Sequence, residues 1–419
     1  MTLDEHLQQA GTYGIAEGDF FGLYGFAHVG PVFTSFVEWT WEAWRKRGEA
    51  PLYGVMRDGG FLTRLLAERF PEARPHLGTL WLSRRLCLLG AILGSEDVEG
   101  LTNLLVRARG MPARVSDALA ELGLDEEIPP AGWTGEERLD QERLPVFLAW
   151  LDQSSSRRAQ IAKTCRAARR AICTHLDNCT VLDHGELGLL DVGYGGNIQR
   201  TLISILQAEG RPTRTWGAYL VTTKGGRWVE QAGGQQQGFL GHLGHPDAFT
   251  AVFLRCRDLF ELFLADTRGP LDHYDLSGMP VCRPSALSAR QHEEIGRLQE
   301  GILAYARFRA DTGHVAPLFE PEARLRQARL AVLRLVMMPS VEEAHQMAGW
   351  IYEDALAVGG ARPLIGGAPA EWDMVRLLAA SRDDVLWPEA TAVLRFRDDC
   401  RMLLQERWEK IAGGLAARS

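Results

Sequence analysis

The sequence lacks the cysteine patterns of common zinc sites and of disulfide-rich secreted proteins. Its seven cysteines are odd in number and scattered, without the paired short spacings that tetrahedral zinc sites require. Reduced thiols in a cytoplasmic protein are therefore expected.

Two further absences argue against nucleic acid as a partner and against a membrane span. The 46 basic residues are outnumbered by 54 acidic ones, whereas binding to a nucleic-acid backbone requires a basic surface. No run approaches the ~20 consecutive apolar residues of a membrane span, and the segment Met1–His6 carries no signal-peptide pattern. We expect a cytoplasmic protein that would meet any membrane-linked substrate at the inner face of the membrane.

What the sequence does contain is a glycine-rich turn after the apolar segment 187–190. The segment ends in a carboxylate, the turn follows, and an amphipathic helix begins, so backbone N–H groups and a helix dipole converge beyond the strand. This arrangement is typical of a phosphate cradle. The residues concerned are Asp191, Gly193, Tyr194, Gly195, Gly196, Asn197 and, in the first turn of the helix, Gln199.

A second turn of this kind, between an apolar strand and a helix, follows the apolar segment 52–56. Here a basic residue and an acid precede two glycines, and helical periodicity begins at once: Arg57, Asp58, Gly59 and Gly60. The arginine supplies charge, and the glycines permit unusual backbone geometry beside a diphosphate. Two anion-binding turns in one chain predict a substrate with two separated phosphate groups.

Alternating strands and helices predict an α/β fold with a mainly parallel sheet, whose ligands bind at the carboxyl ends of the strands. Strands are expected at 52–56, at 79–82, in the segment ending at Asp191, and at 215–221, and a low-complexity loop at 233–238. A helical insertion is expected at about 95–178. Beyond 284 strand signals almost vanish, with helices expected at 291–309, 322–338, 341–357, 372–380 and 390–412. The expected units are an α/β domain, 1–283, and a helical C-terminal subdomain, 284–419.

Three other groups of residues are candidates for the site. The triplet Ser83, Arg84 and Arg85 ends a strand on the same expected edge, where an arginine could clamp a diphosphate by paired hydrogen bonds. Glu261 is an acid inside an apolar helix, so it is either structurally paired or a candidate for binding the acceptor or acting as a general base. A basic helical face at 163–170 could attract an anion, although such a face is more often simply solvated.

The turn that begins at Asp191 has three interpretations. It resembles the first motif of class I methyltransferases, but in that family an acid ends the following strand, whereas here that strand ends in Val221, Thr222 and Thr223. It also resembles the phosphoribosyl-pyrophosphate motif of phosphoribosyltransferases, in which an acid holds the ribose hydroxyls and the loop wraps the 5-phosphate. The third interpretation is a purely structural glycine turn.

The turn at 57–60 resembles the pyrophosphate loop of type I phosphoribosyltransferases, which also precedes the ribose-phosphate loop in sequence. Joined with residues 25–33, 83–85 and 191–199, it resembles the region that follows the phosphatase domain in bacterial polysaccharide proteins of the haloacid-dehalogenase type. The similarity covers roughly residues 20–275. Phosphoribosyltransferases usually carry paired acids and a Thr-Gly-x-Thr loop, whereas this chain has the single Asp191 and then Gly195-Gly196-Asn197.

This resemblance implies a phosphoribosyltransferase-like (Rossmann-like) fold and a glycosyltransferase that moves 5-phospho-ribofuranose from phosphoribosyl pyrophosphate to a glycan or lipid-linked glycan. A separate phosphatase would then remove the phosphate, as in the biosynthesis of a capsule or O antigen. It further implies that Arg57, the Gly59 and Gly60 amides and Arg84 face the diphosphate, with magnesium bridging its oxygens. Asp191 would hold the ribose, the amides of 193–197 the 5-phosphate, and Asp58, or else Glu261, would be the base.

Two alternatives stay open at this point. An S-adenosylmethionine-dependent methyltransferase would bind its cofactor without magnesium. A non-catalytic glycan- or nucleotide-binding module would bind ligand and release no diphosphate.

Overall fold

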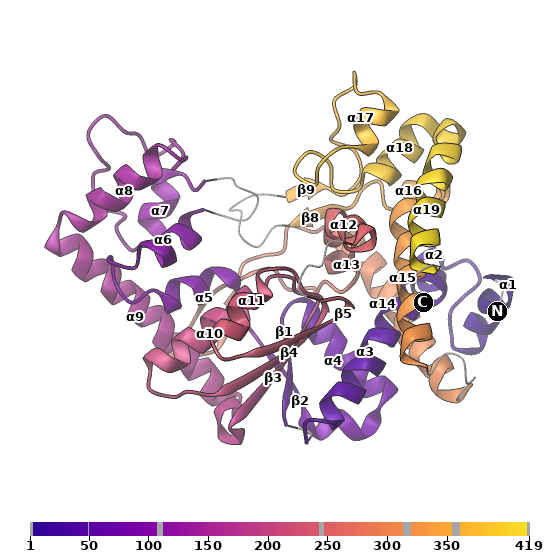
Figure 1. Ribbon diagram of the computed structural model, residues 1–419, viewed down its shortest axis with the longest axis horizontal. Coiled ribbons are helices and arrows are strands. Elements are labelled where there is room, and N and C mark those ends of the chain that lie inside the picture. Colours follow the sequence, from indigo (N-terminus) through magenta and orange to yellow (C-terminus); the bar gives the residue numbers. More distant parts are fainter. Residues whose placement is uncertain are drawn as a thin grey trace.

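Five parallel strands form the central sheet of the protein, which we describe from a computed structural model (Figure 1). The structure describes residues 3–48, 50–106, 112–242, 247–312, 320–353 and 361–416. The strands, in the order β2-β1-β3-β4-β5 across the sheet, are β2 (Leu77–Leu80), β1 (Leu52–Val55), β3 (Glu186–Asp191), β4 (Arg214–Val221) and β5 (Gln235–Gly241). The predicted α/β class and parallel sheet are confirmed.

The order 2-1-3-4-5 is one of the common doubly wound arrangements, with helices on both faces. One face is covered by α3 (Gly30–Arg45), α4 (Asp58–Arg69) and α13 (Arg257–Phe263), and Leu52 and Leu190 point into that core. The other face is covered by α5 (Arg84–Ala91), α9 (Ser155–Asn178) and α10 (Asn197–Ala208), against Tyr53 and Leu189. Burial on both sides explains the uninterrupted apolar runs 52–55 of β1 and 187–190 of β3.

Helices fill the stretch predicted as a helical insertion between β2 and β3, and they lie to one side of the sheet (Figure 1). Residues 107–111 of this stretch lie outside the described part. Buried residues of these helices form a cluster of their own, which joins the sheet layer through α5 and α9. The helices are α6 (Val98–Leu105), α7 (Val115–Glu121), α8 (Arg143–Asp152) and α9.

The C-terminal third is mostly helical, as predicted, and its buried residues share one core cluster with α3, α4 and the sheet. Its helices are α14 (Ala289–Asp311), α15 (Pro321–Met337), α16 (Val341–Gln346), α17 (Met374–Leu378), α18 (Pro388–Phe396) and α19 (Arg401–Ala416). The remaining elements are α1 (Leu3–Thr12), α2 (Phe20–Tyr24), α11 (Gly226–Gln231), α12 (Ala248–Arg255), β6 (Leu271–Tyr274) and β7 (Pro280–Cys282).

Two details of the predicted secondary structure are wrong. The helix expected at 341–357 ends at Gln346, and β8 (Ile351–Glu353) pairs antiparallel with β9 (Ala361–Pro363); residues 354–357 lie outside the described part. The loop expected at 233–238 is the start of edge strand β5. The glutamine side chains of β5 alternate between buried and exposed: Gln236 is buried and its two neighbours are exposed. The buried position, by which an apolar residue normally identifies a strand, is therefore polar here.

One segment, Phe20–Arg45, is long and apolar enough to cross a membrane by length and composition. Its apolar window is 72% buried inside the protein, and α3 within it packs on α4, α14 and α15. In this structure the segment is a core helix.

We predict that Gly59→Ala lowers the free energy of unfolding by about 1–3 kcal/mol, the usual cost of overpacking. A Cβ at this position would lie 2.5 Å from the Leu190 carbonyl oxygen and 2.8 Å from the Gly54 carbonyl carbon. Denaturant unfolding measures the change. Gly296→Ala is the matched control, because Gly296 is exposed on helix α14 with nothing near its Cβ position, and should be neutral or stabilising. Equal stabilities for Gly59→Ala and the wild type would show that α4 does not pack against β3 in this way.

Candidate functional site

A cavity of about 420 Å³ opens at the carboxyl ends of the strands, between β1 and β3. This is the switch point of a 2-1-3-4-5 sheet, where the crossover connections change direction and leave a crevice. Its volume lies within the usual range of small-molecule sites, about 300–1,000 Å³. The cavity is lined by the turns after β1, β2 and β3, by β4 and α13, and by residues from the C-terminal third.

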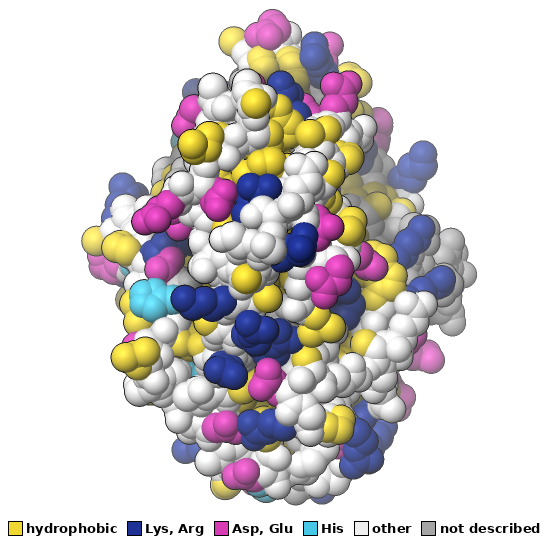
Figure 2. All heavy atoms as spheres, turned by 90° about the vertical axis from the view of Figure 1, so that its left-hand side faces the viewer, with side chains coloured by type: hydrophobic (Ala, Val, Ile, Leu, Met, Phe, Trp, Pro, Cys, Tyr) yellow, Lys and Arg dark blue, Asp and Glu magenta, His cyan; other side chains and the backbone are white. Residues whose placement is uncertain are grey.

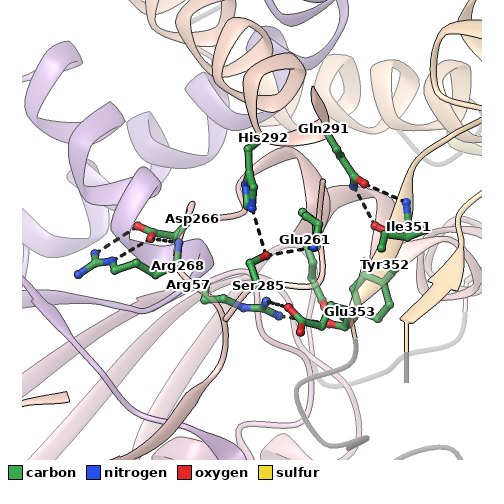
Figure 3. A network of polar contacts seen from close by, with 11 residues as sticks. Arg57, Glu261, Asp266, Arg268, Ser285, Gln291, His292, Ile351, Tyr352 and Glu353 are labelled. Carbon is green, nitrogen blue, oxygen red and sulfur yellow. Dashed lines mark hydrogen bonds and ion pairs between the residues drawn. The ribbon is translucent and has the colours of Figure 1, made fainter. Parts of the chain in front are cut away.

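The turn after β1 brings Arg57 and Asp58 to the cavity. Asp58 is the first residue of α4, and the peptide bond between Met56 and Arg57 is cis. The Arg57 guanidinium does not stand alone, because it forms an ion pair with Glu353 of β8 at 3.3 Å (Figure 3). The predicted anion-binding arginine therefore already contacts one carboxylate of the protein.

The turn after β3 lines the opposite side of the same cavity. Gly196 adopts φ +64° immediately before α10, and no side chain caps the helix N-terminus. A Cβ on Gly193 would lie 2.7 Å from the Tyr219 ring and 2.8 Å from the Asp191 carboxylate, so the loop is drawn tightly against β4. The first N–H groups of α10 are consequently available to an anion in the cavity.

Three carboxylates meet at this cavity: Asp58, Asp191 and Glu261. Burial and the charge of Glu261 raise the pKa of Asp191 to about 7, against the hydrogen bonds from the Val192 and Gly193 amides. Burial and the charges of Glu261 and Asp191 raise the pKa of Asp58 well above its ordinary value. Burial also raises the pKa of Glu261. Near neutral pH the three carboxyl groups therefore carry fewer than three negative charges in total. A cation that enters the cavity would favour their ionised forms.

Of the three predicted residues in the turn after β2, two line the cavity and the third joins neighbouring elements. Ser83 and Arg84 line the cavity, and the Ser83 hydroxyl accepts a hydrogen bond from Leu86 N–H as the N-cap of α5. Arg85 does not line it. Its guanidinium pairs with Glu121 at 2.8 Å and donates to the Asp272 carbonyl, so this predicted donor-binding residue joins α5 to α7 and β6.

Three more predicted residues lie beside the cavity without lining it. The Cβ positions of Gly59 and Gly60 are filled by the β3 backbone and the Met56 side chain, so their small size serves close packing of α4. Gln199 is fully buried; its amide donates to Thr215 and to the Gln235 carbonyl, and accepts from the Tyr219 hydroxyl. Gln199 therefore holds α10 to β4 and β5.

The basic face of α9 also lies apart from the cavity. Lys163, Arg166 and Arg170 are exposed on this helix and none of them lines the cavity. Figure 2 shows the side of the molecule that carries the helices between β2 and β3, where basic and acidic side chains are interspersed. The structure agrees with the interpretation of this stripe as a solvated face.

Several residues that complete the site carry no recognisable signal in the sequence. Tyr352 of β8 donates a hydrogen bond to the Glu261 carboxylate (Figure 3), which lowers the pKa of Glu261 against the effect of burial. Arg382 lines the cavity and pairs with buried Asp258, its Nε lying 2.6 Å from Oδ2. Arg257 lies 5.0 Å above the Tyr194 ring. These side chains come from segments without a local motif, so only tertiary structure reveals them.

Magnesium is compatible with Asp58 and Asp191. In the ranges that the structure describes, no group of three or more His, Cys, Asp or Glu is arranged to hold a metal ion. Mg²⁺ however commonly takes one or two carboxylates and completes its shell with water and substrate phosphates. Two neighbouring carboxylates with raised pKa values supply that kind of donor set.

No protein-family model matches the chain, and no curated protein sequence matches it either.

The raised pKa of Asp191 predicts that stability falls as pH rises. Its ordinary value is 3.8 and its value in the folded protein about 7, so between these limits the folded state binds protons that the unfolded state has released. One such group contributes a slope of at most ~1.4 kcal/mol per pH unit. Asp191→Asn should therefore gain stability relative to the wild type from pH 5 to pH 8, measured by denaturant unfolding. The exposed Asp183→Asn is the control; parallel pH curves for Asp191→Asn and the wild type would contradict the assignment.

Proposed function

We propose that the protein transfers a 5-phosphoribosyl group from phosphoribosyl pyrophosphate to a hydroxyl of a glycan acceptor. One observation carries this proposal: the Arg57 turn and the Asp191 turn, 134 positions apart in sequence, open into a single cavity. A ligand with two separated phosphate groups can contact both turns at once. Arginine at one end and free helix N–H groups at the other match a diphosphate and a monophosphate.

The ligand would lie across the switch point. Arg57 and Arg84 face the diphosphate, and the amides at the start of α10 face the 5-phosphate. Asp191, which ends β3 between them, faces the ribose hydroxyls. The bond from C1 to the diphosphate breaks through an oxocarbenium-like state, so the protein's main contributions are to stabilise the leaving charge and to position the acceptor.

The acceptor hydroxyl must lose a proton as the new bond forms. Asp58 is our first choice as base and Glu261 the second, because both line the cavity and burial raises the pKa of both. A raised pKa strengthens a carboxylate as a proton acceptor. The hydrogen bond from Tyr352 fixes the Glu261 carboxylate in place. Magnesium would be held by Asp191 and the phosphate oxygens of the donor, which leaves Asp58 as the base, and would neutralise charge on the diphosphate.

Incubation with phosphoribosyl pyrophosphate, magnesium and a panel of glycans tests the proposal, with diphosphate release and mass gain on the glycan as readouts. Transfer of a phosphopentose supports it. Binding of S-adenosylmethionine in place of the sugar donor would favour a methyltransferase, and ligand binding without diphosphate release would favour a binding module.

We predict that Arg57→Gln and Asp191→Asn each lower transfer by about 100-fold or more, as expected when a group that stabilises transition-state charge is removed. Steady-state diphosphate release measures the loss. Matched controls are Arg64→Gln, on the exposed side of α4 in an ion pair with Glu300, and Asp183→Asn. Both controls should keep wild-type rates, whereas full activity in either site variant would remove that residue from the mechanism.

A further inference from the structure

Strand β8 is held at the cavity by three consecutive residues, each bonded to a different element (Figure 3). The side chain of buried Gln291, on α14, donates to the Ile351 carbonyl at 2.8 Å and accepts from the Ile351 N–H at 3.1 Å. Tyr352 bonds to Glu261, and Glu353 bonds to Arg57. Gln291 thus holds the backbone at the start of β8, while the next two side chains of the strand contact Glu261 and Arg57.

The Glu353 contact occupies one side of the Arg57 guanidinium. Oε2 of Glu353 lies 3.3 Å from Nη1, and Nη2 donates to the Glu353 carbonyl at 3.3 Å. The two side chains are only 19% and 13% exposed, so water screens the pair weakly. An anion that approaches Arg57 therefore meets a charge that is already compensated.

We propose that the Glu353 carboxylate is a resident competitor for the anion site of Arg57 and sets its specificity. This inference rests on the proposed function, which places the ligand's diphosphate at Arg57. The ligand anion replaces the carboxylate at the guanidinium, and Glu353 turns away while Gln291 keeps β8 in place. A diphosphate, with several charges and paired acceptor oxygens, overcomes this competition. A singly charged anion does not, so the competitor excludes weak anions.

The test measures binding of inorganic pyrophosphate by calorimetry at fixed magnesium. Glu353→Gln removes the competing charge and keeps an oxygen that can accept from Arg57, so it should bind pyrophosphate about 10-fold more tightly than the wild type, roughly 1.4 kcal/mol. The matched control is Glu300→Gln, which removes a carboxylate from the exposed pair between α14 and α4 and should leave affinity unchanged. The double variant Arg57→Gln/Glu353→Gln should lose the gain, because the competition acts only through Arg57.

The outcomes separate this inference from the proposed function. Tighter binding confined to Glu353→Gln and dependent on Arg57 supports it. Unchanged or weaker binding by Glu353→Gln, while the wild type binds through Arg57, overturns the inference and leaves the proposed function standing. Absence of pyrophosphate binding in both the wild type and Glu353→Gln overturns both. If Glu353→Gln fails to fold, as judged by thermal unfolding, Glu353→Ala is measured against the same controls.

Discussion

The parallel pairing of β1 with β3 is the constraint on which the candidate site depends. Leu52 lies opposite Gly188 and Gly54 opposite Leu190, so the two strands end side by side. The turns that follow begin at the same edge of the sheet, although 130 residues of chain separate them. Gly59 maintains this closeness, since only a residue without a side chain lets the first turn of α4 lie against the Leu190 carbonyl. A shift of either strand would separate the arginine of one turn from the carboxylate of the other.

Charge compensation is the second theme of the cavity. Four arginines, Arg57, Arg84, Arg257 and Arg382, line it together with three carboxylates whose pKa values are raised by burial and by the charge of neighbouring carboxylates. Part of the positive charge is neutralised from within, by Glu353 on Arg57 and by Asp258 on Arg382. The cavity thus combines arginines that are already paired with carboxylates whose ionisation is disfavoured.

The residues that the sequence identified belong to one kind of feature, the turn that directly follows a buried parallel strand. There the local pattern determines geometry: a strand end, a glycine and a helix start predict where Asp191 and Arg57 lie. The sequence does not show which of two adjacent residues points into the cavity. Arg84 lines the cavity, whereas Arg85 bonds to α7 and β6. Gln199 shows the same limit, since its amide is satisfied inside the scaffold by three groups distant in sequence. Strand β5 begins with glutamines, and the strands of the β8 hairpin are only three residues long, so neither shows the apolar pattern of a buried strand. Tyr352 and Arg382 reach the site only through tertiary packing.

The contribution of β8 and Arg382 has a consequence for the order in which the protein acquires its function during synthesis. All five strands of the sheet lie before residue 242, yet the wall of the cavity is finished by residues beyond 350. A nascent chain that has just completed the sheet holds the turns after β1 and β3, but Arg57 still lacks Glu353, and Glu261, in the following helix α13, has yet to meet Tyr352. The cavity in this architecture is therefore completed only by the segment beyond residue 350, the last part of its wall to be synthesised.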